Sequence, residues 1–172
     1  MTKEIVYLGL GSNLGDRFAL VKTACVAIAN ITNVQLLKTS PLYITTPVSD
    51  IPQGDYINGV CKLQTTLSIY ELFAQLKKIE SSLGRTDKPK NAPRLIDIDI
   101  LFFGTQHHLS DDLIIPHPRW KERLFVLVPL MDLTDTITYP VNGSLETLNL
   151  KEFLKSFPNL HNERLFPLNK TL

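Results

Sequence analysis

Residues 94–103, RLIDIDILFF, combine an apolar strand pattern with two carboxylates that a buried strand would not normally carry. Side chains alternate across a strand with a period of two residues. One face is therefore expected to be apolar throughout, and it consists of Ile96, Ile98, Ile100 and Phe102. The opposite face places two acids among large apolar side chains, in the order Leu95, Asp97, Asp99, Leu101 and Phe103.

Asp97 and Asp99 are expected to point to the same side, with Cα atoms roughly 6.5–7 Å apart by the strand rise. Two ionised carboxylates this close repel each other and lose hydration, and a divalent cation removes both costs. Mg²⁺ suits such a pair, because it usually takes one or two protein carboxylates and completes its shell with water and substrate phosphate. A surface strand with two solvated aspartates is the alternative, which the apolar neighbours of the pair disfavour.

The segments before this strand alternate between strand and helix patterns. Strands are expected at 4–10, 34–38, 42–44 and 56–65, and helices from residue 18 onward and over 69–83. Ser68 is a suitable N-cap and Gly84 a suitable C′ residue for the second helix. The order β-α-β-β-α-β through Phe103 is that of a ferredoxin-like core, which predicts an α+β fold with a mainly antiparallel sheet and helices packed on it. Crossover helices on a parallel sheet compete with this interpretation, but the alternation stops after Leu133.

The rest of the chain is expected to form a C-terminal extension with weaker patterns. These are an extended segment at 113–118, a helix at 122–133 that Pro129 kinks or splits, a hairpin around 142–143 and a helix at 150–156. Two polar loops that contain proline, 45–55 and 85–93, lie between the regular elements of the core. Without a linker or repeat, residues 1–172 are expected to form a single domain.

The composition is that of an ordinary globular protein: 172 residues, 44% hydrophobic, 20% charged and a net charge of +1. A charge this close to zero gives no support for nucleic-acid or membrane-surface binding. No apolar run approaches a membrane span, and residues 1–4 lead into a strand without a leader pattern, so a cytoplasmic monomer is expected. Cys25 and Cys61 are isolated among apolar residues and are expected to be thiols of the core.

Several basic side chains surround the aspartates in the sequence. Arg85 and Arg94 bracket the second loop, and the others are Lys88, Lys90, His117, Arg119, Lys121 and Arg123. Arginine forks and lysine charges suit phosphate oxygens, so metal-binding carboxylates with these cations point to a polyphosphate substrate. Cations in loops are often only solvated, and that alternative stays open for each of them.

Two further segments offer ligand contacts. Residues 11–15, GSNLG, lack the spacing of a phosphate-binding loop and are interpreted as a tight turn from strand to helix, with Asn13 available to a ligand. Tyr56 and Asn58 face the same side of a strand, where an aromatic ring and an amide suit a planar heterocycle. Cross-strand packing would explain Tyr56 equally well.

Together these segments resemble the 6-hydroxymethyl-7,8-dihydropterin pyrophosphokinase family of folate biosynthesis. The matching segments are 10–17 (LGSNLGDR), 55–58 (DYIN), 84–85 (GR), 93–104 (PRLIDIDILFFG) and 115–118 (IPHP), followed by 123–125 and 129–130. They occur in family order across roughly residues 4–133. The resemblance implies that the chain transfers pyrophosphate from MgATP to the hydroxymethyl group of 6-hydroxymethyl-7,8-dihydropterin, giving AMP and the pterin diphosphate.

The resemblance also implies roles for particular residues. Asp97 and Asp99 match the ligands of two Mg²⁺ ions, and Arg85 and Arg94 match catalytic arginines on the phosphates. The matching ATP-binding residues are Glu80, Arg85, Arg94, Ile100, His117 and Arg123. The matching pterin-binding residues are Thr45, Pro47, Val48, Tyr56, Asn58 and Phe125.

The second loop departs from the family pattern, because Asp87 and Asn91 stand where many members carry an arginine and a tryptophan. Two other classes of function remain as alternatives. A non-catalytic nucleotide- or pterin-binding protein would not need the full set of acids and cations. A metal-dependent phosphohydrolase would not need Tyr56, Asn58 and Phe125, which favour an acceptor other than water.

Overall fold

The computed structural model describes residues 2–48, 52–86, 92–158 and 163–168. The elements follow in the order β1 (Glu4–Ser12), α1 (Arg17–Ala29), β2 (Val34–Thr39), β3 (Leu42–Thr45), β4 (Tyr56–Thr65), α2 (Ile69–Ser82) and β5 (Asp97–Phe103). They continue with β6 (His108–Leu109), β7 (Ile114–Ile115), the 3₁₀ turn η1 (Trp120–Glu122), α3 (Leu124–Met131), β8 (Thr136–Val141), β9 (Ser144–Asn149), α4 (Leu150–Lys155) and β10 (Leu165–Leu168). None of the helices in these ranges has the length and apolar character that crossing a membrane requires.

The main sheet has the strand order β10-β3-β4-β1-β5, and β2 also pairs with β4. Every pairing in it is antiparallel. Strand β3 pairs with residues 56–58 of β4 and β2 with residues 61–65, so the two short strands act together as one interrupted strand. The core therefore has the predicted ferredoxin-like β-α-β-β-α-β arrangement, and the predicted α+β class is confirmed.

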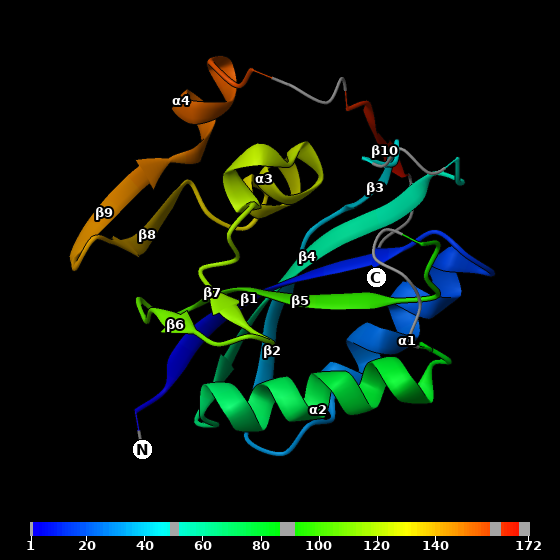
Figure 1. The fold of residues 1–172 in the computed structure, drawn as a ribbon, viewed down its shortest axis with the longest axis horizontal. Coiled ribbons are helices and arrows are strands. Elements are labelled where there is room, and N and C mark those ends of the chain that lie inside the picture. The colour runs from blue at the N-terminus through cyan, green and yellow to red at the C-terminus, as the bar shows by residue number, and fades with distance from the viewer. Residues whose placement is uncertain (1, 49–51, 87–91, 159–162, 169–172) are drawn as a thin grey trace.

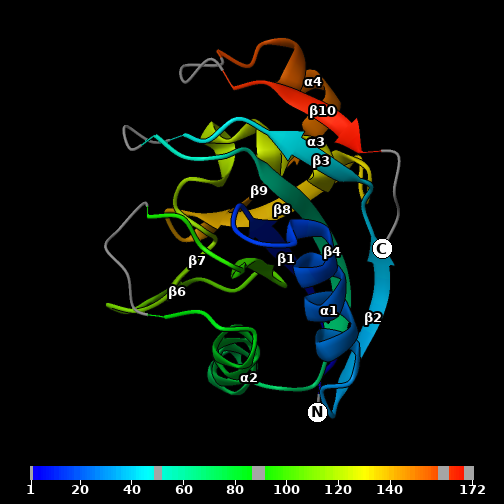
Figure 2. The ribbon, with the colours of Figure 1, turned by 90° about the vertical axis from the view of Figure 1, so that its right-hand side faces the viewer.

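Each face of the sheet has its own apolar core. Helices α1 and α2 cover one face, where Leu8, Leu72 and Ile98 are fully or almost fully buried. On the other face α3 packs with the β8–β9 hairpin and α4 around Phe102 and Trp120 (Figure 1). Figures 1 and 2 show β10 beside β3 at one edge of the sheet. The end of the sheet near β3 and α3 is thus framed by segments far apart in the chain.

Several local features that the sequence predicts, namely helix ends, a turn and two buried thiols, are confirmed. Ser68 and Glu71 form a capping box at the start of α2, and Gly84 ends that helix with φ +87°. The hairpin around residues 142–143 joins β8 to β9 through two residues with positive φ, as a two-residue turn of this kind requires. Cys25 and Cys61 are buried free thiols, as expected.

Two expectations were wrong. The alternation along residues 94–103 breaks after Leu101, because β5 bulges against β1: Tyr7 pairs with Phe102 but Leu8 with Ile100. Phe103 therefore joins the core under α1 and α2, and Phe102 joins the opposite core. The helix expected at 122–133 is instead η1 followed by α3, and the break lies at the extended residue Arg123 rather than at Pro129.

Candidate active site

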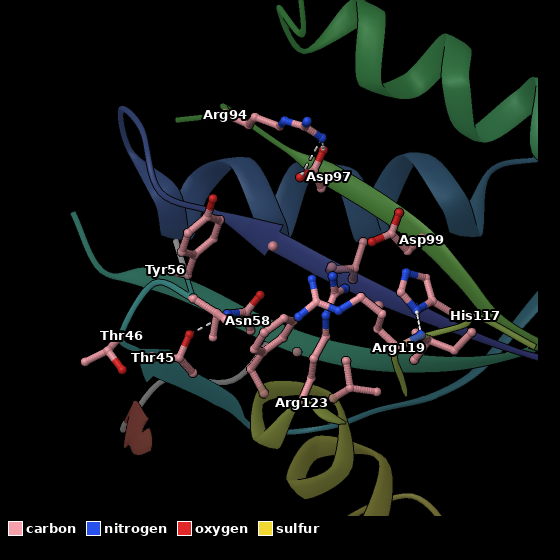
Figure 3. Close-up of a pocket in the computed structure, with 18 of the residues that line it drawn as sticks. Thr45, Thr46, Tyr56, Asn58, Arg94, Asp97, Asp99, His117, Arg119 and Arg123 are labelled. Carbon is pink, nitrogen blue, oxygen red and sulfur yellow. Dashed lines mark hydrogen bonds and ion pairs between the residues drawn. The ribbon is translucent and has the colours of Figure 1, made fainter. Parts of the chain in front are cut away.

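A cleft of about 250 Å³ opens on the β5 face that carries Asp97 and Asp99 (Figure 3). Strand β1 pairs Gly9 with Asp99 and Gly11 with Asp97. Because these two glycines have no side chains, the space beside the aspartates stays empty. The alternating glycines of β1 were a signal that the sequence interpretation missed, since it assigned Gly11 to a turn rather than to the cleft floor.

Glu80 of α2 anchors the strand between the two aspartates. Its Oε1 accepts a hydrogen bond of 2.7 Å from the backbone N–H of Ile98. The side chain is 1% exposed and forms ion pairs with Lys77 and Arg85. Glu80 does not line the cleft, and its carboxylate acts here on the backbone of β5. Its contact with ATP stays a prediction.

Two arginines converge on Asp97. Arg94 Nη1 lies 3.1 Å and Arg85 Nη2 lies 3.2 Å from Asp97 Oδ1. Arg94 lines the cleft, whereas Arg85 lies behind it, between Asp97 and Glu80. These contacts balance the charge of Asp97 and hold both guanidinium groups beside it.

Asp99 has a different environment. Among the ion pairs of the described residues none involves Asp99, and its side chain is exposed to the cleft. Reduced hydration, followed by the negative charge of Asp97, raises the pKa of Asp99. The charged form of the Asp99 carboxylate is disfavoured, and a second carboxylate and an open cleft lie beside it. A divalent cation, which prefers oxygen ligands, fits this place because its charge would offset both carboxylates.

His117 and Arg123 also line this cleft. His117 Nδ1 accepts a hydrogen bond of 3.2 Å from the backbone N–H of Arg119, so its ring proton lies on Nε2. Burial, with the charges of Arg123 and Arg119, lowers the pKa of His117 to about 4. The expectation of a cationic His117 is therefore wrong at neutral pH, where the ring is a neutral donor.

The other expected cations separate into three groups. Arg119 and Arg123 line the cleft, and Figure 3 shows Arg123 facing the aspartates from α3. Lys121 turns away from it, because its Nζ lies over the Tyr139 ring and bonds to the Tyr139 hydroxyl. Lys121 is thus not among the cations that line the cleft. Lys88 and Lys90 lie outside the described residues, as do Asp87 and Asn91.

The predicted acceptor residues gather at the end of the cleft near β3. The cleft is lined there by Thr45, Val48, Tyr56, Asn58 and Phe125, whereas Pro47 lies beside it in the same loop. Asn58 is buried, and its Nδ2 donates a hydrogen bond of 2.6 Å to Thr45 Oγ1, which fixes the amide. The aromatic rings and the fixed amide provide the two kinds of contact that a flat heterocycle requires.

Asn13 does not present its amide to the cleft, so the expectation of a free ligand contact is wrong. Its Nδ2 donates to Gln53 Oε1 at 2.6 Å and to the Gly54 carbonyl at 3.4 Å. Its Oδ1 accepts from the Arg94 backbone N–H at 2.8 Å. Asn13 therefore links the first polar loop, through Gln53 and Gly54, to the backbone of Arg94, whose side chain lines the cleft. Gln53, which lines the cleft, was also missed, since nothing in its local sequence distinguishes it.

A second cleft, of about 230 Å³, also borders Asp99 and His117. It is lined by Phe73, Lys77, Ile98, Ile100, Asp111, Asp112, Leu113, Ile114 and Pro118, together with Asp99 and His117. Ile100, predicted to contact ATP, therefore lies in this cleft and not in the first. Asp99 and His117 border both clefts, so two ligands that fill them would meet at these two side chains.

A family model described as 7,8-dihydro-6-hydroxymethylpterin-pyrophosphokinase (HPPK) matches residues 7–135. The chain belongs to this family. The HPPK match confirms the family that the sequence resembles and, with it, the enzyme class of a pyrophosphokinase.

Two relatives illustrate the similarity. The 2-amino-4-hydroxy-6-hydroxymethyldihydropteridine pyrophosphokinase of Bacillus subtilis (strain 168) is 38% identical over 134 residues, which are 78% of this chain and 80% of that protein. The folic acid synthesis protein fol1 of Pneumocystis carinii is 44% identical over 140 residues, which are 81% of this chain but 19% of that protein. The chain thus spans about a fifth of the length of the second relative.

Solved structures support the fold. The wild-type HPPK-DHPS protein of Plasmodium falciparum with SDX-DHP superposes with a TM-score of 0.68, at 15% sequence identity over 99% of this chain and 51% of that chain. An HPPK-DHPS structure in complex with substrates gives a TM-score of 0.66 over 91% of this chain and 43% of that chain, also at 15% identity. At this identity the likeness concerns the arrangement of the elements and not the site.

Proposed function

We propose that this chain transfers the terminal pyrophosphoryl group of ATP to the hydroxymethyl group of 6-hydroxymethyl-7,8-dihydropterin, giving AMP and the pterin diphosphate. The observation that carries the proposal is the shared border of the two clefts at Asp99 and His117. One cleft ends in aromatic and amide groups and the other runs along apolar side chains of α2 and β5. A heterocyclic acceptor and a nucleotide placed in them would bring hydroxyl and phosphate together at this border.

The acceptor end supports a planar ring. Tyr56 and Phe125 supply aromatic surface, and the fixed amide of Asn58 supplies a donor and an acceptor for the ring edge. We propose Thr45 and Val48 as further walls and Pro47 as a support of the loop. Since Asn58 is already held by Thr45, it need not be ordered when the pterin binds.

The phosphate end supports a metal-bound triphosphate. Asp97 and Asp99 would hold Mg²⁺, because they offer two carboxylates on one strand face beside an open cleft. When bound, Mg²⁺ supplies charge neutralisation for the triphosphate. Arg85 and Arg94, which neutralise Asp97 in this structure, would then be released to contact phosphate oxygens. This exchange of partners keeps the charge of the site balanced with and without substrate.

The residues that line the site also account for how the negative charge that develops during the transfer is stabilised. The hydroxymethyl oxygen attacks the β-phosphorus, a new P–O bond forms, the bond from that phosphorus to the α-phosphate oxygen breaks, and the hydroxyl proton is released. Negative charge then grows on departing AMP and on the transferring group. Arg94 and Arg123, with the Nε2–H of neutral His117, face this region and stabilise that charge.

The decisive experiment incubates the purified protein with ATP, Mg²⁺ and 6-hydroxymethyl-7,8-dihydropterin and separates the nucleotides. The proposal predicts AMP and pterin diphosphate in equal amounts, and neither product without the pterin. The variants Asp97→Asn and Asp99→Asn should be inactive while retaining the circular dichroism of the original protein. ADP as the nucleotide product, or free phosphate in the absence of pterin, would contradict the proposal.

Three sequence expectations remain predictions: a single domain, a monomer and a cytoplasmic location. The relatives include a protein named as a mitochondrial bifunctional folate synthesis protein in Pisum sativum, of which the match covers 26%. Members of this kind therefore occur within longer proteins, so family membership alone does not decide the three expectations.

A further inference from the structure

The C-terminal strand β10 (Leu165–Leu168) reaches the acceptor end of the cleft from outside the stretch that the family model matches. It pairs antiparallel with β3, from Leu165 opposite Thr45 to Leu168 opposite Leu42. Figures 1 and 2 show this strand beside β3 at one edge of the sheet. Two residues that immediately precede β10 make contacts that regular strand pairing does not require.

Glu163 is one of them, and it caps helix α3. The N-cap residue of α3, Arg123, makes no capping hydrogen bond with its side chain, which leaves the first backbone N–H groups in need of acceptors. Glu163 Oε2 accepts from the backbone N–H of Phe125 at 3.4 Å, from a position 38 residues further along the chain. Glu163 is only 5% exposed, and a carboxylate at a helix N-terminus is electrostatically favourable.

The same carboxylate faces Arg123. Burial and the neighbouring Arg119 lower the pKa of the Arg123 guanidinium, whereas the negative charges of Asp99 and Glu163 act in the opposite direction. Arg123 also lies over the Phe125 ring, with its Cζ 5.4 Å from the ring centroid. Glu163 therefore contacts the backbone of one wall residue of the cleft and balances the charge of another.

Arg164 is the second residue, and it holds the opposite wall. Its backbone N–H donates to Thr46 Oγ1 at 3.0 Å, and its carbonyl accepts from the Thr46 N–H at 3.1 Å. Thr46 lines the cleft directly after Thr45, whose hydroxyl accepts the hydrogen bond of Asn58. Consecutive residues of the C-terminal segment thus connect the Phe125 wall with the Thr45–Thr46 wall.

We infer that Glu163 is a positioning residue for the acceptor: with the backbone of Arg164 it sets the separation of the two walls between which the pterin ring binds. This inference rests on the proposed function of the cleft. Glu163 itself does not line the cleft and acts through Phe125 and Arg123. Removing the hydrogen-bond acceptor should therefore weaken acceptor binding, whereas an effect on the nucleotide through Arg123 should follow only the charge of Glu163 and appear equally in Glu163→Ala and Glu163→Gln.

The test compares Glu163→Ala, Glu163→Gln and the control Glu152→Ala, which removes an exposed carboxylate of α4 paired with Lys155. Binding of 6-hydroxymethylpterin is followed by its fluorescence, binding of a non-hydrolysable ATP analogue with Mg²⁺ by calorimetry, and exchange of the Phe125 and Thr46 amides by NMR. Glu163→Ala should weaken pterin binding by about fivefold, the factor that corresponds to a helix cap. Its KM for the pterin should rise above that of Glu163→Gln, while kcat and nucleotide affinity should be the same in these two variants, because both lack the charge that acts on Arg123.

Glu163→Gln should recover most of the pterin affinity, because its amide oxygen still accepts from Phe125, and Glu152→Ala should match the original protein. The Phe125 amide should exchange faster in Glu163→Ala than in Glu163→Gln. Equal losses of pterin and nucleotide affinity, or an unchanged pterin affinity in Glu163→Ala, would overturn the inference while the proposed function stands. If the original protein bound no pterin at all, both would fall.

Discussion

Replacing Gly11 by alanine should damage the acceptor end of the cleft through a single steric contact. A Cβ atom at residue 11 would lie 2.6 Å from Asn58 Oδ1, closer than such atoms approach in real proteins. The backbone at Gly11 has ordinary strand geometry, so the substitution adds no backbone strain. Asn58 can relieve the clash only by turning away, which breaks its hydrogen bond of 2.6 Å to Thr45.

The size of the effect follows from that broken hydrogen bond. Both partners are buried, and leaving buried polar groups unpaired costs about 1–3 kcal/mol. The melting temperature should fall by about 2–12 °C, since 1 kcal/mol corresponds to about 2–4 °C in a protein of this size. Because the displaced amide is the group expected to contact the ring edge, the pterin dissociation constant should rise by a factor of about 5 to 150.

Gly9→Ala is the matched control, two residues away on the same strand and in the same cleft. A Cβ atom there meets Leu101 Cδ2 at 3.5 Å, an ordinary contact. Calorimetric melting and fluorescence titration with 6-hydroxymethylpterin measure both variants. Gly9→Ala should retain the melting temperature of the original protein and lose less pterin affinity than Gly11→Ala, because it leaves Asn58 in place. If Gly11→Ala behaved like Gly9→Ala in both assays, the assigned role of Asn58 would be refuted.

Three further predictions concern charge in the site. Asp99→Asn should raise the melting temperature of the ligand-free protein at neutral pH, because the raised pKa of Asp99 indicates that its charge is disfavoured on folding; the gain should shrink as the pH falls through the raised pKa and vanish well below 3.8, where the group is protonated in both states. His117→Gln should flatten the loss of stability as the pH falls from 6.5 to about 4, since in that range the unfolded chain binds a proton at His117 and the folded protein does not, and an unchanged pH profile would argue against its burial as a neutral ring. Glu80→Ala should lower the free energy of unfolding by about 2–3 kcal/mol in urea titrations, and Glu80→Gln by clearly less, because its Oε1 still accepts from Ile98; equal losses would contradict the backbone role of Glu80.

The sequence predicted those parts of the fold that depend on neighbouring residues. The capping box of Ser68 and Glu71, the left-handed Gly84 and the turn at residues 142–143 are decided by a few consecutive side chains. The α+β class followed from the order of these elements. The same local reasoning placed Asp97 and Asp99 on one face of β5, and the structure shows both lining one cleft.

The features that the sequence could not supply depend on contacts between distant segments. The bulge in β5 is defined by its register against β1, and the pattern RLIDIDILFF is consistent with a regular strand as well. Asn13 and Glu163 look like ordinary polar residues until the fold brings them to Arg94 and Phe125. The neutral state of His117 likewise arises from burial and from nearby arginines rather than from its own neighbours alone.

The central claim is that Asp97 and Asp99 hold Mg²⁺ on a triphosphate beside the acceptor. A crystal structure with a non-hydrolysable ATP analogue, Mg²⁺ and 6-hydroxymethylpterin tests it most directly. We expect metal ions about 2.0–2.1 Å from oxygens of both aspartates. We also expect Arg94 to have moved from Asp97 to the phosphates. A structure in which Arg85 and Arg94 still contact Asp97, and no metal ion contacts either aspartate, would contradict the account.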